Sequence, residues 1–274
     1  MAIPQRTISI DQSYLMVTKI ETSISGKSGK ESMTGSATGF FYSFNSKIYL
    51  ITNRHVVSDQ KNDSFPDSML IHIHTDSNNL QKITPHKIDL YDASKNPIWL
   101  EHPIYPEIID VIAIEIPPIS NAVIYSFSNS SALPENIILS PNEELILVGY
   151  PLGFYDNIYN LPVCRSATIA SAYGVPFKGL PCFLVDAYSH PGLSGAPAIR
   201  PSKTIQSTTT AAIQISPPTP PYLLGINSGQ YRRYGIDLRL NMIWESHLIE
   251  EILAKKLIRT QKIPQATLDE LGHS

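Results

Sequence analysis

The chain has 274 residues, of which 42% are hydrophobic and 16% are charged, and its formal net charge is −3. This composition is typical of a globular protein with a sizeable core, and it excludes the strongly basic footprint of a nucleic-acid binder. The N-terminal segment MAIPQRTISIDQSYLMV lacks the charged start and apolar run of a signal peptide. No segment approaches the roughly 18 continuous apolar residues of a membrane span. We therefore expect a cytoplasmic protein without nucleic-acid or membrane partners.

Short apolar runs bounded by turn residues occupy most of the chain. They are FFYSF at 40–44, KIYLIT at 47–52, MLIHIH at 69–74, DVIAIEI at 110–116, ELILVGY at 144–150, PCFLVDAY at 181–188 and PYLLGIN at 221–227. These runs have the length and the Ile, Val, Tyr and Phe content of strands, and Gly and Pro punctuate them. Regular short strands without long helical patterns between them predict an all-β barrel or sandwich.

Two segments depart from this pattern. Residues 200–220 are rich in Ser, Thr and Pro, which predicts a long polar loop or hairpin. From about residue 242 to 258 the apolar residues follow helical spacing, at Trp244, Leu248, Ile249, Ile252, Leu253 and Leu257. We expect one amphipathic helix there, packed on the barrel. No internal repeat or linker interrupts the sequence, so residues 1–274 are interpreted as a single unit.

The two cysteines, Cys164 and Cys182, bear on the redox compartment. A secreted enzyme of this size often carries several disulfides, whereas two cysteines fit a reducing compartment. We expect both to be reduced, buried and inert, since free cysteine behaves mainly as a small hydrophobic residue. A single disulfide between them is the alternative.

Three segments carry residues suited to nucleophilic catalysis. His55 lies in TNRHVV after an apolar run, Asp110 opens the apolar run DVIAI, and Ser194 lies in PGLSGAP among small residues. Each has an ordinary structural interpretation when taken alone. Together they supply a serine nucleophile, a histidine base with a pKa near neutrality, and a carboxylate that orients the imidazole. The order His, Asp, Ser is that of chymotrypsin-type enzymes.

Six segments also resemble those of a known family: GSATGF at 35–40, TNRHVV, DVIAI, VGYPLG at 148–153, Asp186-Ala187 with PGLSG, and LGIN at 224–227. From about Met16 to Leu253 the sequence is similar to trypsin-like serine peptidases, and most to the protease domain of bacterial HtrA-type proteins. The resemblance implies two six-stranded β-barrels of chymotrypsin type, at about 14–120 and 135–240. The active site would lie between them.

The resemblance also implies a role for each site residue. Ser194 would be the nucleophile, His55 the general base and acid, and Asp110 the orienting carboxylate of a serine endopeptidase without a cofactor or metal. The N–H groups of Gly192 and Ser194 would form the oxyanion hole. Ser228, Gly229 and Gln230 would pair with the backbone of a protein or peptide substrate, and Tyr188 would occupy the substrate pocket. For Ser228, support of the aspartate and an ordinary strand-end position both stay open.

Departures from the family pattern concern regulation. Leu193 replaces the aspartate that pairs with a freed N-terminus in trypsin-like zymogens, so that activation relay is absent. The PDZ domain typical of HtrA-type proteins is not expected within the 274 residues. A regulatory protein partner is therefore one hypothesis, with the loops at 149–157 and 186–193 as the places where a switch would act.

Other functions and sites compete with this interpretation. The main alternative is a catalytically silent trypsin-like domain that acts as a binding or scaffold module. An esterase with the same triad is a second alternative, but the sequence lacks a G-x-S-x-G elbow. His72 and His74 have the spacing of two metal ligands on one strand face, yet an exposed alternating pair is the preferred interpretation. His190 could line the cleft, although nothing in the sequence requires it.

Overall fold

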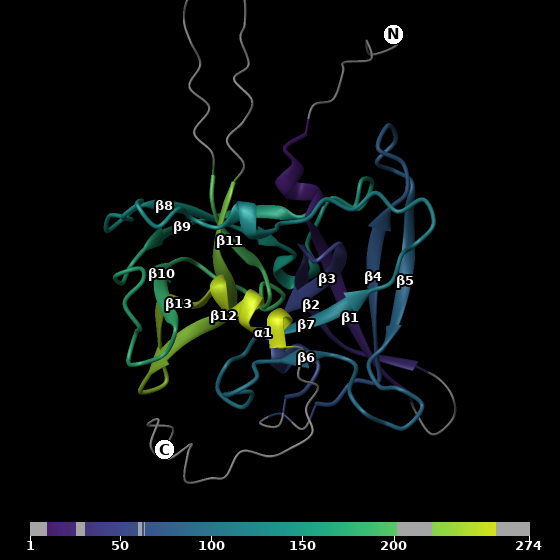
Figure 1. Ribbon diagram of the computed structural model, residues 1–274, viewed down its shortest axis with the longest axis horizontal. Helices are drawn as coiled ribbons and strands as arrows, with labels where there is room; N and C mark the ends of the chain where they lie inside the picture. Colours follow the sequence, from purple (N-terminus) through teal and green to yellow (C-terminus); the bar gives the residue numbers. More distant parts are fainter. Residues whose placement is uncertain (1–9, 26–30, 60–61, 63, 202–220, 256–274) are drawn as a thin grey trace, which may run out of the picture.

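The computed structural model describes residues 10–25, 31–59, 62, 64–201 and 221–255. The predicted polar segment at 200–220 therefore lies almost wholly outside the described residues. Two β-sheets form the molecule, with one α-helix at their junction (Figure 1). None of the helices in the described part of the protein has the length and apolar character that a membrane crossing needs.

The first sheet has seven strands in the order β5-β4-β1-β2-β3-β7-β6. The strands are β1 (Val17–Ser25), β2 (Glu31–Phe44), β3 (Lys47–Thr52), β4 (Ser68–His74), β5 (Ile83–Asp89), β6 (Leu100–Glu101) and β7 (Ile112–Ile116). A six-stranded closed barrel was predicted for this half. The sheet instead has β5 and β6 at its two edges. Because β6 is only two residues long, it offers too short a ladder to close the sheet.

The second sheet is a closed barrel of six strands in the order β10-β13-β12-β11-β8-β9. The strands are β8 (Glu144–Gly149), β9 (Val163–Ile169), β10 (Cys182–Asp186), β11 (Pro197–Arg200), β12 (Tyr222–Arg233) and β13 (Ile236–Glu245). Tyr234 and Gly235, both with positive φ, join β12 to β13. Positive φ at both central residues is characteristic of the two-residue hairpin turn whose twist matches that of the strands.

Helix α1 (His247–Lys255) follows the barrel directly. It buries Leu248, Ile249, Ile252 and Leu253, the apolar stripe expected of an amphipathic helix. The predicted start at about residue 242 was wrong, because residues up to Glu245 belong to β13. Trp244 lies opposite both Cys182 and Ile226. Its backbone therefore belongs to the barrel, although its spacing also fits the helix, and its side chain packs in the same cluster as that of Leu248. The predicted end at 258 lies outside the described residues.

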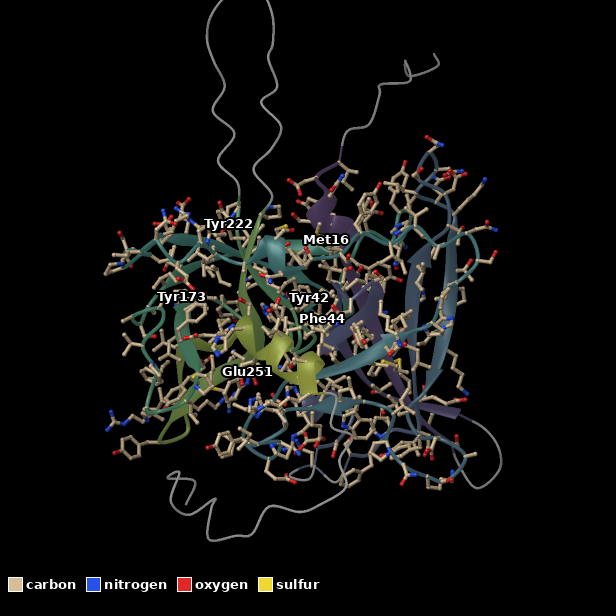
Figure 2. The ribbon with its side chains drawn as sticks, in the orientation of Figure 1. Met16, Tyr42, Phe44, Tyr173, Tyr222 and Glu251 are labelled. Carbon is tan, nitrogen blue, oxygen red and sulfur yellow. The ribbon has the colours of Figure 1, made fainter. Side chains whose placement is uncertain are left out.

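The core joins the two sheets and the helix. One cluster of buried side chains takes Phe40 from β2, Val148 from β8, Trp244 from β13 and Leu248 from α1. Hydrogen bonds tie the helix to the first sheet: Tyr42 donates to Glu250 at 2.9 Å, and His102 lies 3.0 Å from Glu251. Figure 2 shows Met16, Tyr42, Phe44 and Glu251 near the junction, and Tyr173 and Tyr222 on the side of the barrel. This shared core fixes the orientation of one sheet against the other.

The predicted all-β class of chymotrypsin type, with a C-terminal helix, is confirmed. Cys164 and Cys182 are both free. Cys182 is buried as expected, whereas Cys164 is exposed, since the side chains of β9 alternate between solvent and interior.

Candidate active site

His55 and Asp110 lie next to the ends of two neighbouring strands of the first sheet. His55 lies in the single turn Arg54–Val56 that follows β3, and Asp110 comes two residues before β7. Because β3 and β7 pair with Thr52 opposite Ile112, the two side chains meet at one end of the sheet. Asp110 accepts a hydrogen bond from the His55 backbone N–H at 2.9 Å, and its other oxygen lies 2.7 Å from His55 Nδ1.

Ser194 comes from the barrel, in the loop between β10 and β11. Its Oγ lies 2.9 Å from His55 Nε2, so the serine, the imidazole and the carboxylate form one continuous series of contacts. Ser228 extends this series by donating its hydroxyl to Asp110 Oδ2 at 2.6 Å. The structure thus brings together the three residues predicted to react. It also favours the interpretation of Ser228 as a support for the aspartate over that of an ordinary strand-end residue.

The electrostatics of His55 suit a base. Burial disfavours the charged imidazole, but the hydrogen bond and the negative charge of Asp110 outweigh it, so the pKa of His55 is raised above 6.5. A raised pKa makes the imidazole a stronger proton acceptor. A serine hydroxyl needs such an acceptor within hydrogen-bond reach to act as a nucleophile.

The loop that carries Ser194, residues 191–196, presents two unused donors. Within residues 191–196, the N–H groups of Leu193, Gly195 and Ala196 donate to backbone carbonyls. The N–H groups of Gly192 and Ser194 donate to no acceptor among the described residues. The Pro191 carbonyl accepts from Leu152 N–H at 2.6 Å, and in a trans peptide this directs the Gly192 N–H the opposite way. Two free donors beside a nucleophile can stabilise an oxyanion.

Gly192 and Gly195 are required by the shape of this loop. Gly192 has a φ of +95°, and a Cβ there would lie 2.4 Å from the Tyr150 carbonyl oxygen. Gly195 has a φ of +81°, and its Cβ would lie 2.1 Å from the Thr38 carbonyl oxygen. Both backbones pass too close to their neighbours for a side chain, and both need the left-handed region that glycine reaches without strain.

Thr38 anchors the Ser194 loop to the first sheet, a role that the sequence did not reveal. Its buried hydroxyl donates to the Gly192 carbonyl at 2.7 Å and accepts from Tyr150 N–H at 3.1 Å. Its own N–H donates to the Ser194 carbonyl at 2.9 Å. One residue of β2 therefore holds both residues that supply the free donors. The motif GSATGF marked this strand, but no local pattern marks Thr38 as a contact across 154 residues of sequence.

Asn227 anchors the same loop from the barrel. Its fully buried side chain donates to the Leu193 carbonyl at 2.8 Å, and its backbone carbonyl accepts from Gly195 N–H at 2.9 Å. The side chain of Leu193 is itself fully buried. The loop is therefore held by amide and hydroxyl hydrogen bonds and by an apolar side chain.

The residues predicted to contact substrate lie on this side of the barrel. Ser228, Gly229 and Gln230 follow one another in β12, and Tyr188 is 54% exposed. Gln230 donates to the Ser189 carbonyl at 2.9 Å, and the ring of Tyr188 meets that of His190 at 4.7 Å. Their roles toward a substrate stay predictions.

The two histidines with metal-ligand spacing have structural partners. His72 lies 3.1 Å from Glu21, and buried His74 lies 2.8 Å from the Tyr159 carbonyl. The expected exposed pair was therefore wrong, because β4 is covered by neighbouring elements on both faces. Within the described ranges, no group of three or more His, Cys, Asp or Glu side chains could hold a metal ion.

Replacing Thr38 with valine is expected to lower the free energy of unfolding by about 2–4 kcal/mol, because it leaves the buried Gly192 carbonyl and Tyr150 N–H without partners. Urea denaturation measures this loss. Thr84→Val on exposed β5 is the matched control, with an expected change within about 0.5 kcal/mol. Equal stability of the Thr38 variant and the wild type would remove the hydroxyl from the anchoring of the loop.

Comparison with known proteins agrees with this geometry. The family model of the trypsin-like peptidase domain matches residues 37–204, which is more than half of the chain and includes His55, Asp110 and Ser194. No curated protein matches the sequence. With its closed β-barrel, its second sheet and this match, the protein belongs to the family of trypsin-like peptidase domains.

Proposed function

We propose that the protein is an active serine endopeptidase, with Ser194 as nucleophile, His55 as general base and acid, and Asp110 as the orienting carboxylate. The observation that carries the proposal is the unbroken series of contacts from Ser194 Oγ through His55 to Asp110, beside two free N–H donors. A trypsin-like domain that only binds its partners would not need to keep these side-chain contacts and N–H donors together. The motif resemblance further suggests kinship with HtrA-type protease domains.

Each residue has a defined step in this mechanism. Ser194 Oγ adds to the carbonyl carbon of the scissile bond while its proton passes to His55 Nε2. The developing oxyanion is stabilised by the N–H groups of Gly192 and Ser194. His55 then gives the proton to the leaving amine, and the acyl group stays on Ser194. Water, activated in the same way by His55, releases the acid and restores the serine hydroxyl.

The direct test is hydrolysis of an unfolded protein substrate, with the new N-termini identified by mass spectrometry. Cleavage at internal peptide bonds is expected. A purified protein that binds the substrate but produces no new N-termini would favour the silent binding module instead. A protein that hydrolyses small esters but no peptide bond would favour an esterase.

The pH dependence of kcat/KM should report His55. Protonated His55 cannot accept the serine proton, so activity is lost as the pH falls through its pKa. Because Asp110 raises that pKa, we expect the acid limb to lie above the ordinary histidine value of 6.5. A profile measured on one peptide between about pH 5 and 9 determines its position. An acid limb below 6.5 would mean that Asp110 does not stabilise the imidazolium.

Gly192→Ala should lower kcat by about 10²–10³-fold, the usual cost of losing one oxyanion donor. The Cβ would collide with the Tyr150 carbonyl, so the loop must shift and carry the Gly192 N–H away. Gly174→Ala is the control, since Gly174 has a φ of +78° but no atom within 4 Å of an added Cβ. We expect the control to be strained but fully active. Comparable kcat values for the two variants would exclude Gly192 from the oxyanion hole.

A further inference from the structure

The cations of the two sheets have different partners. In the first sheet most of them neighbour carboxylates: Lys19, Lys47, Arg54, Lys82 and Lys87. In the barrel Arg200 pairs with Glu143. Five other cations of the barrel form no ion pair with any described carboxylate: Arg165, Lys178, Arg232, Arg233 and Arg239. We call these five residues the hairpin cations.

The hairpin cations lie around the hairpin of β12 and β13, which projects at the lower left of Figure 1. Arg232 and Arg233 are the last residues of β12, and Arg239 lies on β13. Lys178 contacts the hydroxyl of Tyr231, next to Arg232 in β12. Arg239 lies beside the segment that follows β10, since its backbone carbonyl accepts from Ala187 N–H.

Aromatic rings hold three of these cations. The guanidinium of Arg165 lies 5.7 Å from the Tyr188 ring, Lys178 Nζ lies 5.1 Å from the Tyr231 ring, and the guanidinium of Arg233 lies 5.1 Å from the Tyr234 ring. Arg165 also donates to the Tyr188 carbonyl at 3.0 Å. A ring face or a carbonyl positions a cation without cancelling its charge.

Cations therefore outnumber carboxylates around this hairpin, in a protein whose net charge is −3. Strands β10 and β13 carry three carboxylates, Asp186, Asp237 and Glu245, and none of them forms an ion pair with the hairpin cations among the described residues. Asp237 lies opposite Arg232 in the ladder. Asp237 instead accepts from the Arg239 backbone N–H. A local excess of uncancelled positive charge attracts an anionic ligand.

The hairpin continues the edge of β12 that lies next to the Ser194 loop. Strand β11 pairs with β12 only as far as Ile226. Asn227 makes the last backbone bonds on this edge, because its N–H donates to the Ala196 carbonyl and its carbonyl accepts from Gly195 N–H. Beyond Asn227 the same edge of β12 has no partner strand among the described residues, from Ser228 beside Asp110 to Arg233. A peptide can add to such an edge as a further strand.

The chemistry sets the direction of that peptide. His55 must give its proton to the leaving amine, so the substrate residues that follow the scissile bond lie toward the first sheet. The substrate residues that precede the bond then lie over the barrel, along β12. Arg232 and Arg233 follow Ser228 by four and five residues, about 13–17 Å in a strand. Side chains about four to six positions before the scissile bond would reach them.

We infer that the hairpin cations select peptide substrates with Asp or Glu about four to six positions N-terminal to the scissile bond. This inference rests on the proposed function, because it takes the cleavage point to be Ser194. It assigns a substrate class to a surface that the triad does not use. Tyr188, at the predicted substrate pocket, connects this surface to the site through its contacts with Arg165.

Binding to the Ser194→Ala protein tests the inference without relying on turnover. Two labelled peptides would share one sequence, except that one carries three Glu and the other three Gln at the positions named. We expect the Glu peptide to bind about tenfold more tightly at about 50 mM salt, and the difference to vanish near 0.5 M, because exposed ion pairs are weak and screened.

Arg232→Gln with Arg233→Gln should reduce that preference to less than about threefold. Lys95→Asn is the control, since Lys95 forms no ion pair with a described carboxylate and its φ of +65° is one that asparagine tolerates. It should keep the full preference. Equal affinity for the two peptides, or equal loss of preference in both variants, would overturn the inference. So would an oligonucleotide of equal charge that binds while the Glu peptide does not.

Cleavage separates this inference from the proposed function. If the wild type hydrolyses both peptides with equal kcat/KM, the proposed function stands and the acidic preference is refuted. If it hydrolyses neither peptide and the Ser194→Ala protein still prefers the Glu peptide with the expected salt dependence, the surface is supported as an acidic-peptide site, while the proposed catalysis fails.

Discussion

Ser194→Ala is expected to reduce kcat by about 10⁶-fold, because members of such a triad act as a unit and the alanine has no atom to form the acyl-enzyme. Folding should be preserved. The one hydrogen bond of the Ser194 hydroxyl among the described residues is with His55, and the loop is held by Thr38 and Asn227 instead. The free energy of unfolding should therefore change by less than about 0.5 kcal/mol.

Initial rates on one peptide, together with urea denaturation, measure both effects. Ser166→Ala, at an exposed serine of β9, is the matched control and should be fully active. An alanine variant that keeps most of its activity would remove Ser194 from the mechanism. A variant that unfolds would leave the rate uninformative, and Ser194→Gly would then replace it, since glycine also removes the hydroxyl.

Asp110→Asn is expected to reduce kcat by about 10⁴-fold. Asp110 accepts from the His55 backbone, lies 2.7 Å from His55 Nδ1 and accepts from Ser228. An asparagine has the same shape, but its amide group can meet Nδ1 as a donor. The imidazole would then carry its proton on Nε2, where it cannot accept from Ser194. Loss of the carboxylate charge should also lower the pKa of His55 and move the acid limb of the residual activity downward.

Asp89→Asn provides the control, since Asp89 is an exposed carboxylate at the end of β5 and should be dispensable. Measurements of kcat and of the pH dependence of kcat/KM for both variants test these expectations. A near-normal rate for Asp110→Asn would mean that another carboxylate supports His55. A slow variant with an unchanged acid limb would mean that Asp110 acts only through the backbone of His55.

The sequence was sufficient for the parts of the site that local motifs encode. TNRHVV, DVIAI and PGLSGAP each carry a residue whose chemistry is recognisable, and the glycines of the last motif mark a backbone that bends too tightly for a side chain. The roles of Thr38 and Asn227 could not be predicted in the same way. Each depends on which carbonyl a small polar side chain meets after distant strands have packed, and neither residue type is unusual in a strand.

For the fold too, features set by neighbouring residues could be predicted, whereas features set by distant segments could not. Alternating apolar runs predicted the strands, but strand count and closure depend on pairing between segments far apart in sequence. Trp244 illustrates the conflict, because its spacing to Leu248 fits a helix while the closure of the barrel places it opposite Cys182. The hairpin cations were not predicted either, since they become one surface only when residues 165, 178 and 232–239 are brought together.

Covalent labelling with a fluorophosphonate probe, followed by peptide mapping, tests the central claim most directly. The probe reacts with serines that an adjacent base activates, and the two free N–H donors would bind its phosphoryl oxygen. We predict one adduct per molecule, on Ser194, which forms on the wild type and is lost in His55→Ala. A folded wild-type protein that forms no adduct, or forms it on another serine, would contradict the assignment of this site as catalytic.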